Sequence, residues 1–252
     1  MIISVSGYSG TGKDTVGKLI QILTCAESKE LSDEKITDLL NNYENNQWWI
    51  EEDSTWLIKK WAGKLKQIAS ILTGIPVENF EDQDFKKTYL GPEWDTYGIL
   101  RGATSNRQVA IQTEPHKKDG PWLKHSDCTQ VHNRMTVREF LQKLGTDGLR
   151  MGLHDNVWLN ALMSDYNIQS LRSNKKPNWI ITDTRFPNEA KTIKDYNGIL
   201  IRVNRAGVKP ISDHPSETSL DNWDYDYVIN NDSTIEQLYK EVKNILIKEN
   251  IL

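Results

Sequence analysis

Cysteine is scarce in this 252-residue sequence: there are two, Cys25 and Cys128, and neither lies in a Cys-x-x-Cys or mixed Cys/His spacing. A structural zinc site needs such a spacing, and small secreted domains stabilised by disulfides are much richer in cysteine. We therefore interpret both residues as small buried or idle thiols in a reducing compartment.

Long apolar runs and an excess of basic residues are also missing. No segment approaches the roughly 18 consecutive apolar residues of a membrane-spanning helix, and no basic leader precedes the first apolar segment. The formal net charge is −4, whereas a non-specific duplex-DNA binder needs a basic face. We expect a cytoplasmic protein that binds neither membranes nor nucleic-acid polymers. A small anionic ligand needs only a local basic site and remains compatible with this charge.

Short apolar segments that alternate with amphipathic helices predict an α/β fold. The predicted strands are residues 2–6, 55–60, 179–182, 199–203 and 227–229. Such an alternation is typical of a parallel sheet that is covered by helices on both faces. Right-handed crossovers then favour a doubly wound architecture.

Serine and threonine mark the starts of several predicted helices. Ser32 precedes a short helix within a polar stretch, and Thr136 with Glu139 forms a capping box. A second capping box, from Ser233 to Glu236, is predicted to open the final helix.

The first predicted strand runs directly into a glycine-rich loop that ends in lysine. It matches the phosphate-binding pattern, which lies between a strand and a helix. Glycines let backbone N–H groups point at phosphate oxygens, and the helix N-terminus adds free N–H groups and the positive end of its dipole. The alternative is a glycine-rich turn followed by a chance lysine. The predicted nucleotide-binding residues are Gly7, Ser9, Gly10, Thr11, Gly12 and Lys13, the last close to the β- and γ-phosphates.

One position departs from the phosphate-binding pattern. Asp14 stands where serine or threonine usually supplies a magnesium-binding hydroxyl, and Thr15 follows one residue later. We include both residues in the predicted nucleotide site. Either Thr15 assists in binding Mg²⁺, or phosphates and water hold the ion, which magnesium tolerates. A direct Asp14 ligand is the third alternative.

A second acidic residue, Asp183, ends the apolar strand 179–182. Carboxyl ends of strands face the ligand crevice of an open α/β sheet, so this carboxylate could orient Mg²⁺ or cap the helix that follows. Arg185 is a candidate to neutralise charge on a transferred phosphoryl group. Glu189, on the first helical turn, either hydrogen-bonds a base or favours the helix dipole.

The capped helix near residue 137 carries polar side chains at four-residue intervals. Arg138 and Gln142 begin the series, and Thr146 and Arg150 continue near the same face. Because arginine can bind phosphate with two hydrogen bonds and glutamine can read a base edge, all four are candidate substrate-binding residues. Residues 145–148, Gly-Thr-Asp-Gly, are expected to break this helix. The alternative is a solvated helix face.

Basic residues also lie in the segment 202–221, between two predicted strands. This segment contains Arg202, Arg205 and Lys209. A mobile loop with arginines could close over phosphates and exclude water, so Arg205 is a predicted nucleotide-binding residue. The alternative is a polar surface loop.

Five motifs occur together in the chain. They are Gly-Lys-Asp-Thr at 12–15, Trp-Ala-Gly-Lys-Leu-Lys at 61–66, Leu-Gln-Lys-Leu-Gly-Thr-Asp at 141–147, Thr-Asp-Thr-Arg-Phe-Pro-Asn-Glu-Ala at 182–190 and His-Pro-Ser-Glu-Thr at 214–218. In this combination the chain resembles the bacteriophage deoxynucleoside monophosphate kinases. The resemblance implies a three-layer α/β/α P-loop kinase fold with a roughly five-stranded parallel sheet, and a homodimer. It also makes Lys64 an acceptor-site candidate, together with Arg138, Gln142, Arg150 and Arg185.

The length and composition of the chain predict its domain organisation. Residues 1–252 are then a single P-loop kinase domain. Residues 27–53 and 77–133 are predicted insertions or a substrate-side lobe, and residues 202–221 are a predicted lid-like loop.

The predicted function is transfer of the γ-phosphoryl group of ATP, with Mg²⁺, to a deoxynucleoside monophosphate, by positioning and electrostatics. Lys13, Arg185 and Arg138 are the predicted catalytic residues, and Thr15 and Asp183 the predicted metal ligands. The base is not predicted, because several tryptophans, Trp61, Trp94 and Trp158 among them, could stack on any base. The alternatives are a kinase for another phosphorylated small molecule, such as a phosphomevalonate kinase, and a non-catalytic nucleotide-binding switch.

Overall fold

The chain forms two compact units in a computed structural model that describes residues 1–26, 31–101, 112–114, 128–210 and 215–252. The first unit comprises Met1–Lys64 and Asn156–Leu252, and the second comprises Leu65–Asp155. The predicted strands of the α/β fold all lie in the first unit.

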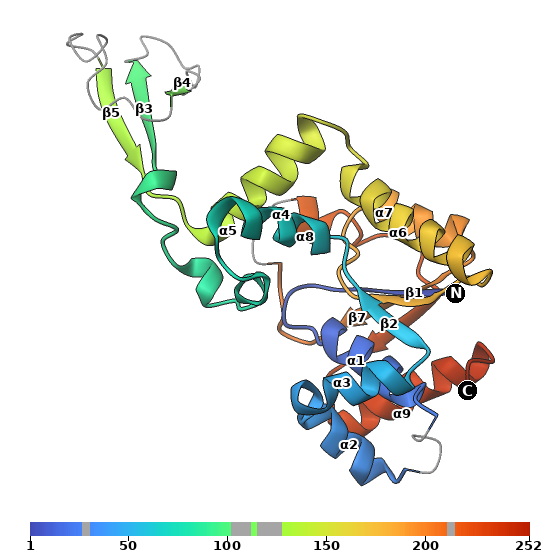
Figure 1. The fold of residues 1–252 in the computed structure, drawn as a ribbon. Helices are drawn as coiled ribbons and strands as arrows, with labels where there is room; N and C mark the ends of the chain where they lie inside the picture. Colours follow the sequence, from blue (N-terminus) through green and yellow to red (C-terminus); the bar gives the residue numbers. More distant parts are fainter. Residues whose placement is uncertain (27–30, 102–111, 115–127, 211–214) are drawn as a thin grey trace. The chain divides into compact units, whose positions relative to one another are not determined.

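A five-stranded parallel sheet with the strand order β2-β6-β1-β7-β8 forms the centre of the first unit (Figure 1). All five residues of the central strand β1 (Ile2–Ser6) are buried, as expected for a parallel strand covered on both faces. The other strands are β2 (Trp56–Lys59), β6 (Asn178–Ile181), β7 (Ile199–Asn204) and β8 (Tyr227–Asn230).

Helices cover both faces of this sheet. Ile3 and Val5 of β1 belong to a core shared with α1 (Lys13–Leu23) and α9 (Ile235–Lys248). Ile2 belongs to the core on the opposite face, shared with α6 (Val157–Ser173) and α7 (Pro187–Asp195) (Figure 1). The predicted three-layer α/β/α fold is therefore confirmed. Within the described part of the chain, no helix is both long and apolar enough to cross a membrane.

The polar stretch 27–53 contributes α2 (Asp33–Asn41) and α3 (Tyr43–Asp53) to the first unit. Ser32 caps α2, as predicted, by accepting a hydrogen bond from the Lys35 N–H. Ile36, Leu39 and Ile50 are buried in the same core as α1, so this stretch packs against the sheet layer although its composition is polar.

The second unit combines short helices with a small antiparallel sheet. Its core contains Ala69, Phe80, Met135, Val137 and Phe140. Helix α4 (Gly63–Thr73) starts in the first unit, continues into the second and ends before Gly74. The remaining elements are η2 (Val77–Phe80), η3 (Phe85–Lys87), η4 (Pro92–Trp94), β3 (Thr96–Arg101), β4 (Gln112–Glu114), β5 (Cys128–Asn133), α5 (Val137–Gln142) and η6 (Lys143–Met151), and the sheet order is β4-β3-β5.

Two predicted helix boundaries are wrong. Thr234, and not Ser233, caps α9, because its hydroxyl accepts the Gln237 N–H. The expected break at 145–148 is absent, since α5 continues directly into the π-helix η6. A Cβ at Gly145 would lie 2.8 Å from Leu65 Cδ2, so this glycine permits close packing instead of ending the helix.

Candidate functional site

A glycine-rich loop joins β1 to α1 at the carboxyl end of the central strand. Gly12, the N-cap of α1, has a φ of +96°, where any residue with a side chain is strained. A Cβ on Gly7 would lie 2.6 Å from the Val203 carbonyl oxygen, so β7 passes too close for a larger residue. The backbone therefore needs glycine at both ends of the predicted phosphate loop. Ser9 is half-buried, and Gly10 is exposed.

The Tyr8 carbonyl oxygen is the hydrogen-bonding centre of this loop. It accepts the Thr11 hydroxyl at 2.9 Å, the Thr11 N–H at 3.3 Å and the Lys13 ammonium at 3.3 Å. Burial of Lys13 lowers its pKa below the 10.5 of a free lysine, while the charge of Asp14 acts in the opposite direction. The loop thus holds its lysine as a cation poorly solvated by water, which favours a polyanion beside it.

Asn231, which sequence reasoning missed, fixes the loop from the last strand. Its Nδ2 donates to the Thr11 carbonyl oxygen at 2.9 Å, and its backbone N–H donates to the Asn204 carbonyl oxygen at 2.8 Å. The signal available in the sequence was its position directly after a strand, where ligand-facing residues of parallel sheets gather.

Asp14 and Thr15 lie on the first turn of α1. Asp14 Oδ1 accepts the Thr182 hydroxyl at 2.8 Å and lies 3.8 Å from Lys60 Nζ. These contacts connect α1 to the ends of β6 and β2. The Thr15 side chain is half-buried on the same turn.

The Asp183 carboxylate binds backbone N–H groups at the end of β2. Oδ1 accepts the Trp61 N–H at 2.8 Å, and Oδ2 accepts the Ala62 N–H at 3.0 Å. The proposed cap of the helix after Asp183 is therefore wrong. That cap is made by Glu189, whose Oε2 accepts the N–H groups of Arg185 and Phe186 at 2.9 and 3.1 Å.

Arg185 lies beyond the carboxyl end of β6, and its charge acts on Lys13. Its Nη1 donates to Glu217 Oε1 at 2.6 Å. Glu217 belongs to the short helix α8 (Pro215–Thr218), and its charge also acts on Lys13. The structure thus gathers Lys13, Arg185 and Glu217 at one edge of the sheet.

Two arginines of the 202–221 segment have different surroundings. Arg202 lies within β7 and is buried, with an ion pair to Asp221 at 3.0 Å. Arg205 follows the strand and is exposed. Residues 211–214 of this predicted lid-like loop, including His214, lie outside the described residues.

The four candidate substrate residues of α5 and η6 are expected from helical geometry to lie near one stripe. In an α-helix of about 3.6 residues per turn, a step of four residues rotates about 40° beyond one full turn. The side chains of Arg138, Gln142, Thr146 and Arg150 would therefore shift gradually around the axis of an uninterrupted α-helix. A π-helix takes more residues per turn, because its hydrogen bonds join i to i+5. The change to π geometry at Lys143 therefore rotates the last two residues back toward Arg138. Arg138 also donates to Gln83 Oε1 at 3.0 Å.

Lys64 and the tryptophans have contacts of their own. Lys64 Nζ lies 2.9 Å from Asp165 Oδ2 in a half-exposed ion pair, which contributes little stability. Trp61 and Trp158 are buried, and Trp94 packs edge-to-face on Phe140 with ring centroids 4.7 Å apart. The structure uses these three rings, suggested for base stacking, in packing.

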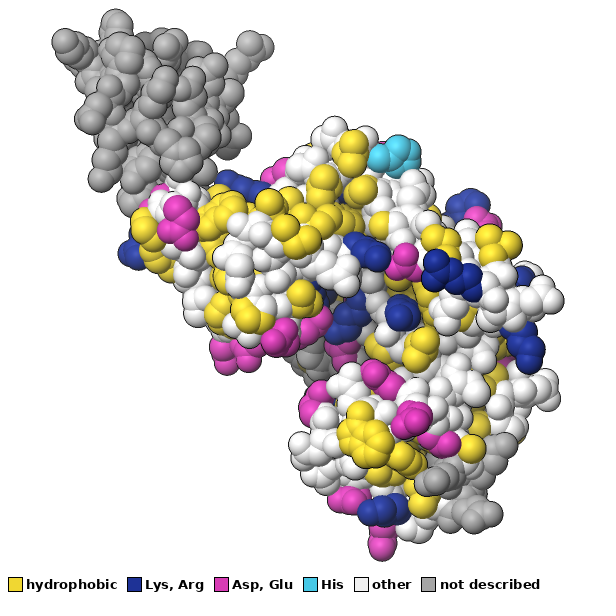
Figure 2. Space-filling view, in the orientation of Figure 1, with side chains coloured by type: hydrophobic (Ala, Val, Ile, Leu, Met, Phe, Trp, Pro, Cys, Tyr) yellow, Lys and Arg dark blue, Asp and Glu magenta, His cyan; other side chains and the backbone are white. Residues whose placement is uncertain are grey.

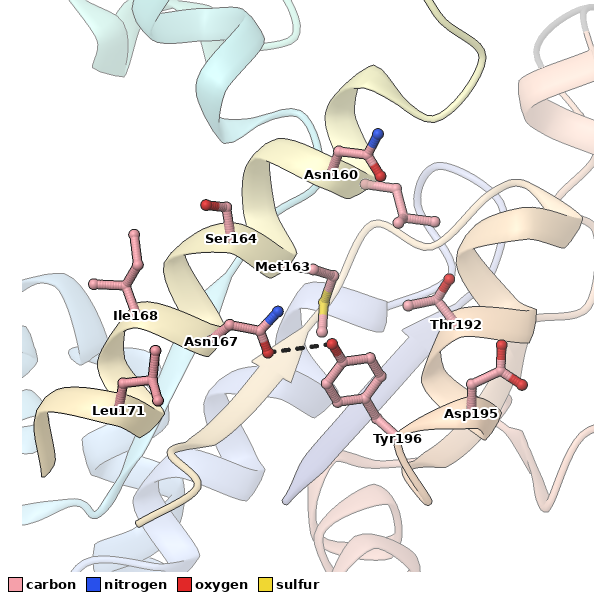
Figure 3. A pocket seen from close by; sticks show the side chains of 10 residues that line it. Asn160, Met163, Ser164, Asn167, Ile168, Leu171, Thr192, Asp195 and Tyr196 are labelled. Carbon is pink, nitrogen blue, oxygen red and sulfur yellow. Dashed lines mark hydrogen bonds between the residues drawn. The ribbon is translucent and has the colours of Figure 1, made fainter. Parts of the chain in front are cut away.

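A groove of about 500 Å³ runs between α6 and α7 (Figure 3). Met163 and Tyr196 form part of its lining, and the Tyr196 hydroxyl donates to Asn167 Oδ1 at 3.2 Å. No lysine or arginine lines it. The groove therefore lacks the cations that a nucleotide phosphate needs, and we do not assign it to the site.

Oxygen atoms of the kind that Mg²⁺ prefers lie on and near the first turn of α1. Across the described ranges, no three His, Cys, Asp or Glu side chains gather into a metal site. Mg²⁺ usually keeps several waters and takes one or two protein ligands plus substrate phosphates. The carboxylate of Asp183 and the hydroxyl of Thr15 are of the hard oxygen type that the ion prefers.

Comparison with known sequences gives one family. The profile described as "Deoxynucleotide monophosphate kinase" matches residues 99–242, which is more than half of the chain. This match starts after the phosphate loop, so loop and family profile are independent observations.

Individual viral relatives support the same family. A candidate deoxynucleotide monophosphate kinase of Acanthamoeba polyphaga mimivirus is 36% identical over 115 residues, covering 42% of this chain and 59% of that protein. The deoxynucleotide monophosphate kinase of Enterobacteria phage T4 is 28% identical over 151 residues, or 58% of this chain and 62% of the relative. The deoxynucleoside-5'-monophosphate kinase of Escherichia phage T5 is 26% identical over 242 residues, 87% of this chain and 85% of the relative. The chain thus spans about three fifths of the length of the first two relatives.

Proposed function

Because this chain belongs to the deoxynucleotide monophosphate kinase family, we propose that it transfers the γ-phosphoryl group of ATP to a deoxynucleoside monophosphate, giving the diphosphate. The observation that carries the proposal is the buried Lys13 inside a phosphate loop at the carboxyl edge of the sheet, with Arg185 beside it. A loop of this kind binds polyphosphate, and a second cation matches the charge spread over a transferred phosphoryl group.

The proposed donor site is the phosphate loop of the first unit. Its backbone N–H groups and Lys13 bind the β- and γ-phosphates, and exposed Arg205 is proposed to assist. Thr15 and Asp183 would hold Mg²⁺, and the bound ion would neutralise charge that develops on the phosphates.

The proposed acceptor residues are those predicted from the sequence. Arg138 and Arg150 would bind the acceptor phosphate, and Gln142 the base, each from the stripe on α5 and η6. Lys64, Thr146, Arg185 and Glu189 complete the set as proposals. Glu189 already caps α7, so its role toward substrate would be to hold the Arg185 backbone.

The chemistry needs little from the protein beyond placement and charge. The attacking atom is an oxygen of a phosphate that is already ionised at neutral pH, so a strong general base is not required. Catalysis then rests on aligning the two phosphates and stabilising the charge of the transferred group, with Lys13, Arg185 and Arg138 as the proposed catalytic residues.

Further aspects of the proposal concern partners and location. From the sequence, we propose that the protein forms a homodimer and is located in the cytoplasm. We also propose that the substrate is a nucleotide and not a nucleic-acid polymer. Figure 2 supports this for one face, on which Lys and Arg side chains are interspersed with Asp and Glu. A polymer binder instead needs a continuous basic surface.

A coupled assay of ADP release tests the function. The purified chain is given ATP and Mg²⁺ with each of the four common deoxynucleoside monophosphates and one modified pyrimidine monophosphate in turn. We expect turnover with at least one of them. Turnover only with a different phosphorylated metabolite would favour the small-molecule kinase alternative, and ATP binding without any turnover would favour the binding switch.

Replacing Lys13 tests the donor site. We expect Lys13→Ala to lower transfer by at least about a thousandfold, because the loop then loses its buried cation. Lys18→Ala is the matched control: Lys18 lies on the same helix and pairs with Glu44. Full activity of folded Lys13→Ala would contradict the mechanism.

A further inference from the structure

Arg202 stacks on the aromatic ring of Tyr8 in the phosphate loop. Its guanidinium carbon lies 4.7 Å from the centroid of the Tyr8 ring, and Tyr8 is the second residue of the loop. Only 8% of the Arg202 surface is exposed, so the contact is partly shielded from water. Under such conditions a cation over an aromatic face is attracted more strongly than at an open surface.

The hydrogen bonds of Arg202 are already used within the protein. Nε donates to Asn204 Oδ1 at 3.2 Å, and Nη2 to Asp221 Oδ1 at 3.0 Å. Nη1 donates to the Tyr225 hydroxyl at a longer 3.4 Å. Binding a phosphate would require breaking these contacts. Arg202 is therefore suited to hold a neighbour in place, in contrast to the exposed Arg205.

Arg202 contacts Tyr8, the residue on which the conformation of the phosphate loop depends. The Tyr8 carbonyl oxygen accepts hydrogen bonds from Thr11 and from the Lys13 ammonium. Fixing the Tyr8 ring limits rotation of its peptide, and this keeps the carbonyl and the following N–H groups oriented. A loop that is ordered before ATP arrives loses less conformational entropy on binding.

We propose that Arg202 is a positioning residue that fixes the phosphate loop through the Tyr8 ring and thereby raises affinity for the triphosphate of ATP. The proposal rests on the proposed function, since it takes the loop to be the ATP site. It predicts an effect on ATP binding that is separable from acceptor binding and from the transfer step.

Direct measurement of MgATP binding without an acceptor tests the proposal. Titration calorimetry is done on the whole chain and on Tyr8→Leu, which removes the ring face. We expect ATP affinity to fall about three- to tenfold, the range of a partly shielded cation–π contact. The conservative variant Tyr8→Phe keeps the ring and is expected to restore most of this loss. Unchanged affinity in a folded Tyr8→Leu protein, or an equal loss in Tyr8→Phe, would overturn the proposal.

A double-mutant cycle separates this contact from a general loss of structure. Arg202→Met is expected to weaken ATP binding to a similar degree as Tyr8→Leu. The double variant Tyr8→Leu/Arg202→Met should bind ATP no more weakly than whichever single variant binds ATP more weakly. Independent, additive losses would overturn the proposal. Since Arg202 is buried, circular dichroism checks whether Arg202→Met is folded. If that variant is unfolded, the comparison of Tyr8→Leu with Tyr8→Phe decides the question alone.

Steady-state kinetics give a readout that a purely structural defect would not produce. We expect Tyr8→Leu to raise the KM for ATP, while the KM for the monophosphate stays within about twofold. A lower kcat with unchanged KM for ATP would overturn the proposal. ATP binding by the unaltered chain without transfer to any monophosphate would contradict the proposed function only. Absence of ATP binding would contradict both the proposed function and the proposed role of Arg202.

Discussion

Three carboxylates that follow β1 and β6 in the chain are bound to groups of the protein itself. Asp183 accepts two backbone N–H groups at the end of β2, Glu189 accepts two at the start of α7, and Asp14 accepts the Thr182 hydroxyl. Charge-assisted hydrogen bonds of this kind hold the ends of strands and helices in register. The carboxylates thereby order the backbone around Lys13 without each requiring a ligand.

The lowered pKa of Lys13 makes a prediction for ATP binding. Burial lowers this pKa below 10.5, whereas phosphate oxygens beside the ammonium would raise it again. Between the two pKa values, binding must take up a proton, so ATP affinity should fall as pH rises through the lowered value. Below that value, Lys13 is charged in both states and contributes no pH dependence.

Calorimetry in buffers of different ionisation enthalpy measures this proton uptake from neutral pH up to 10.5, the pKa of a free lysine. The uptake should disappear in any Lys13→Ala protein that still binds ATP. Net proton release over this range, or identical uptake without Lys13, would show that the lysine is not the group concerned.

At the scale of helices and strands, the buried side-chain amide of Gln21 connects two helices and a strand. Gln21 of α1 donates to the Trp56 carbonyl oxygen of β2 at 2.8 Å and accepts the Tyr43 hydroxyl of α3. Gln21 is fully buried, so loss of its amide would leave both partners without this bond in an apolar environment. The stretch 27–53 is thus held to the sheet by a specific polar contact as well as by apolar packing.

Gln21→Leu should therefore destabilise the protein. We expect the free energy of unfolding to fall by about 1–3 kcal/mol, the cost of leaving buried polar groups unpaired. Urea unfolding measures it, with Gln237→Leu as the control at an exposed glutamine of α9, where we expect a change below about 0.5 kcal/mol. Equal unfolding midpoints and slopes for Gln21→Leu and the unaltered protein would show that the amide contact contributes nothing.

The π-helix η6 gives Arg150 a predicted role in the acceptor site. Loss of a charge-assisted bond to phosphate in Arg150→Met should raise the KM for the monophosphate about 10- to 100-fold, with ATP affinity unchanged. Lys143→Met, at an exposed residue of the same π-helix, is the control. Equal KM values for the two variants would remove Arg150 from the acceptor site.

How far the sequence predicted these elements depends on the range of the interactions. The strands of the sheet, the capping box of α5 and the phosphate loop follow from residues close in the chain, and all were predicted. The π-helix was not, because glycines at 145 and 148 indicate a break unless the packing of Leu65 on Gly145 is known. The contacts of Asn231 with Thr11 and of Arg202 with Tyr8 join distant parts of the chain. The position of Asn231 after a strand indicates the ligand-facing edge of the sheet, but no local pattern predicts either contact.

On the scale of the whole molecule, the strand order brings motifs that are distant in sequence to one edge of the sheet. With β1 central between β6 and β7, the residues that follow these strands reach the same carboxyl edge. Lys13, Arg185 and Asp183 therefore interact electrostatically although they are far apart in sequence. The second unit carries the predicted acceptor stripe on α5 and η6, within one continuous helical segment.

The fate of the γ-phosphate of ATP shows whether the chain is a deoxynucleoside monophosphate kinase. The chain is incubated with Mg²⁺, ATP labelled in the γ-phosphate and each deoxynucleoside monophosphate, and the nucleotides are separated by chromatography. We expect a labelled deoxynucleoside diphosphate in amounts equal to the ADP formed, and none with Lys13→Ala. Label found only in inorganic phosphate, or only in a phosphorylated acceptor that is not a nucleotide, would contradict it.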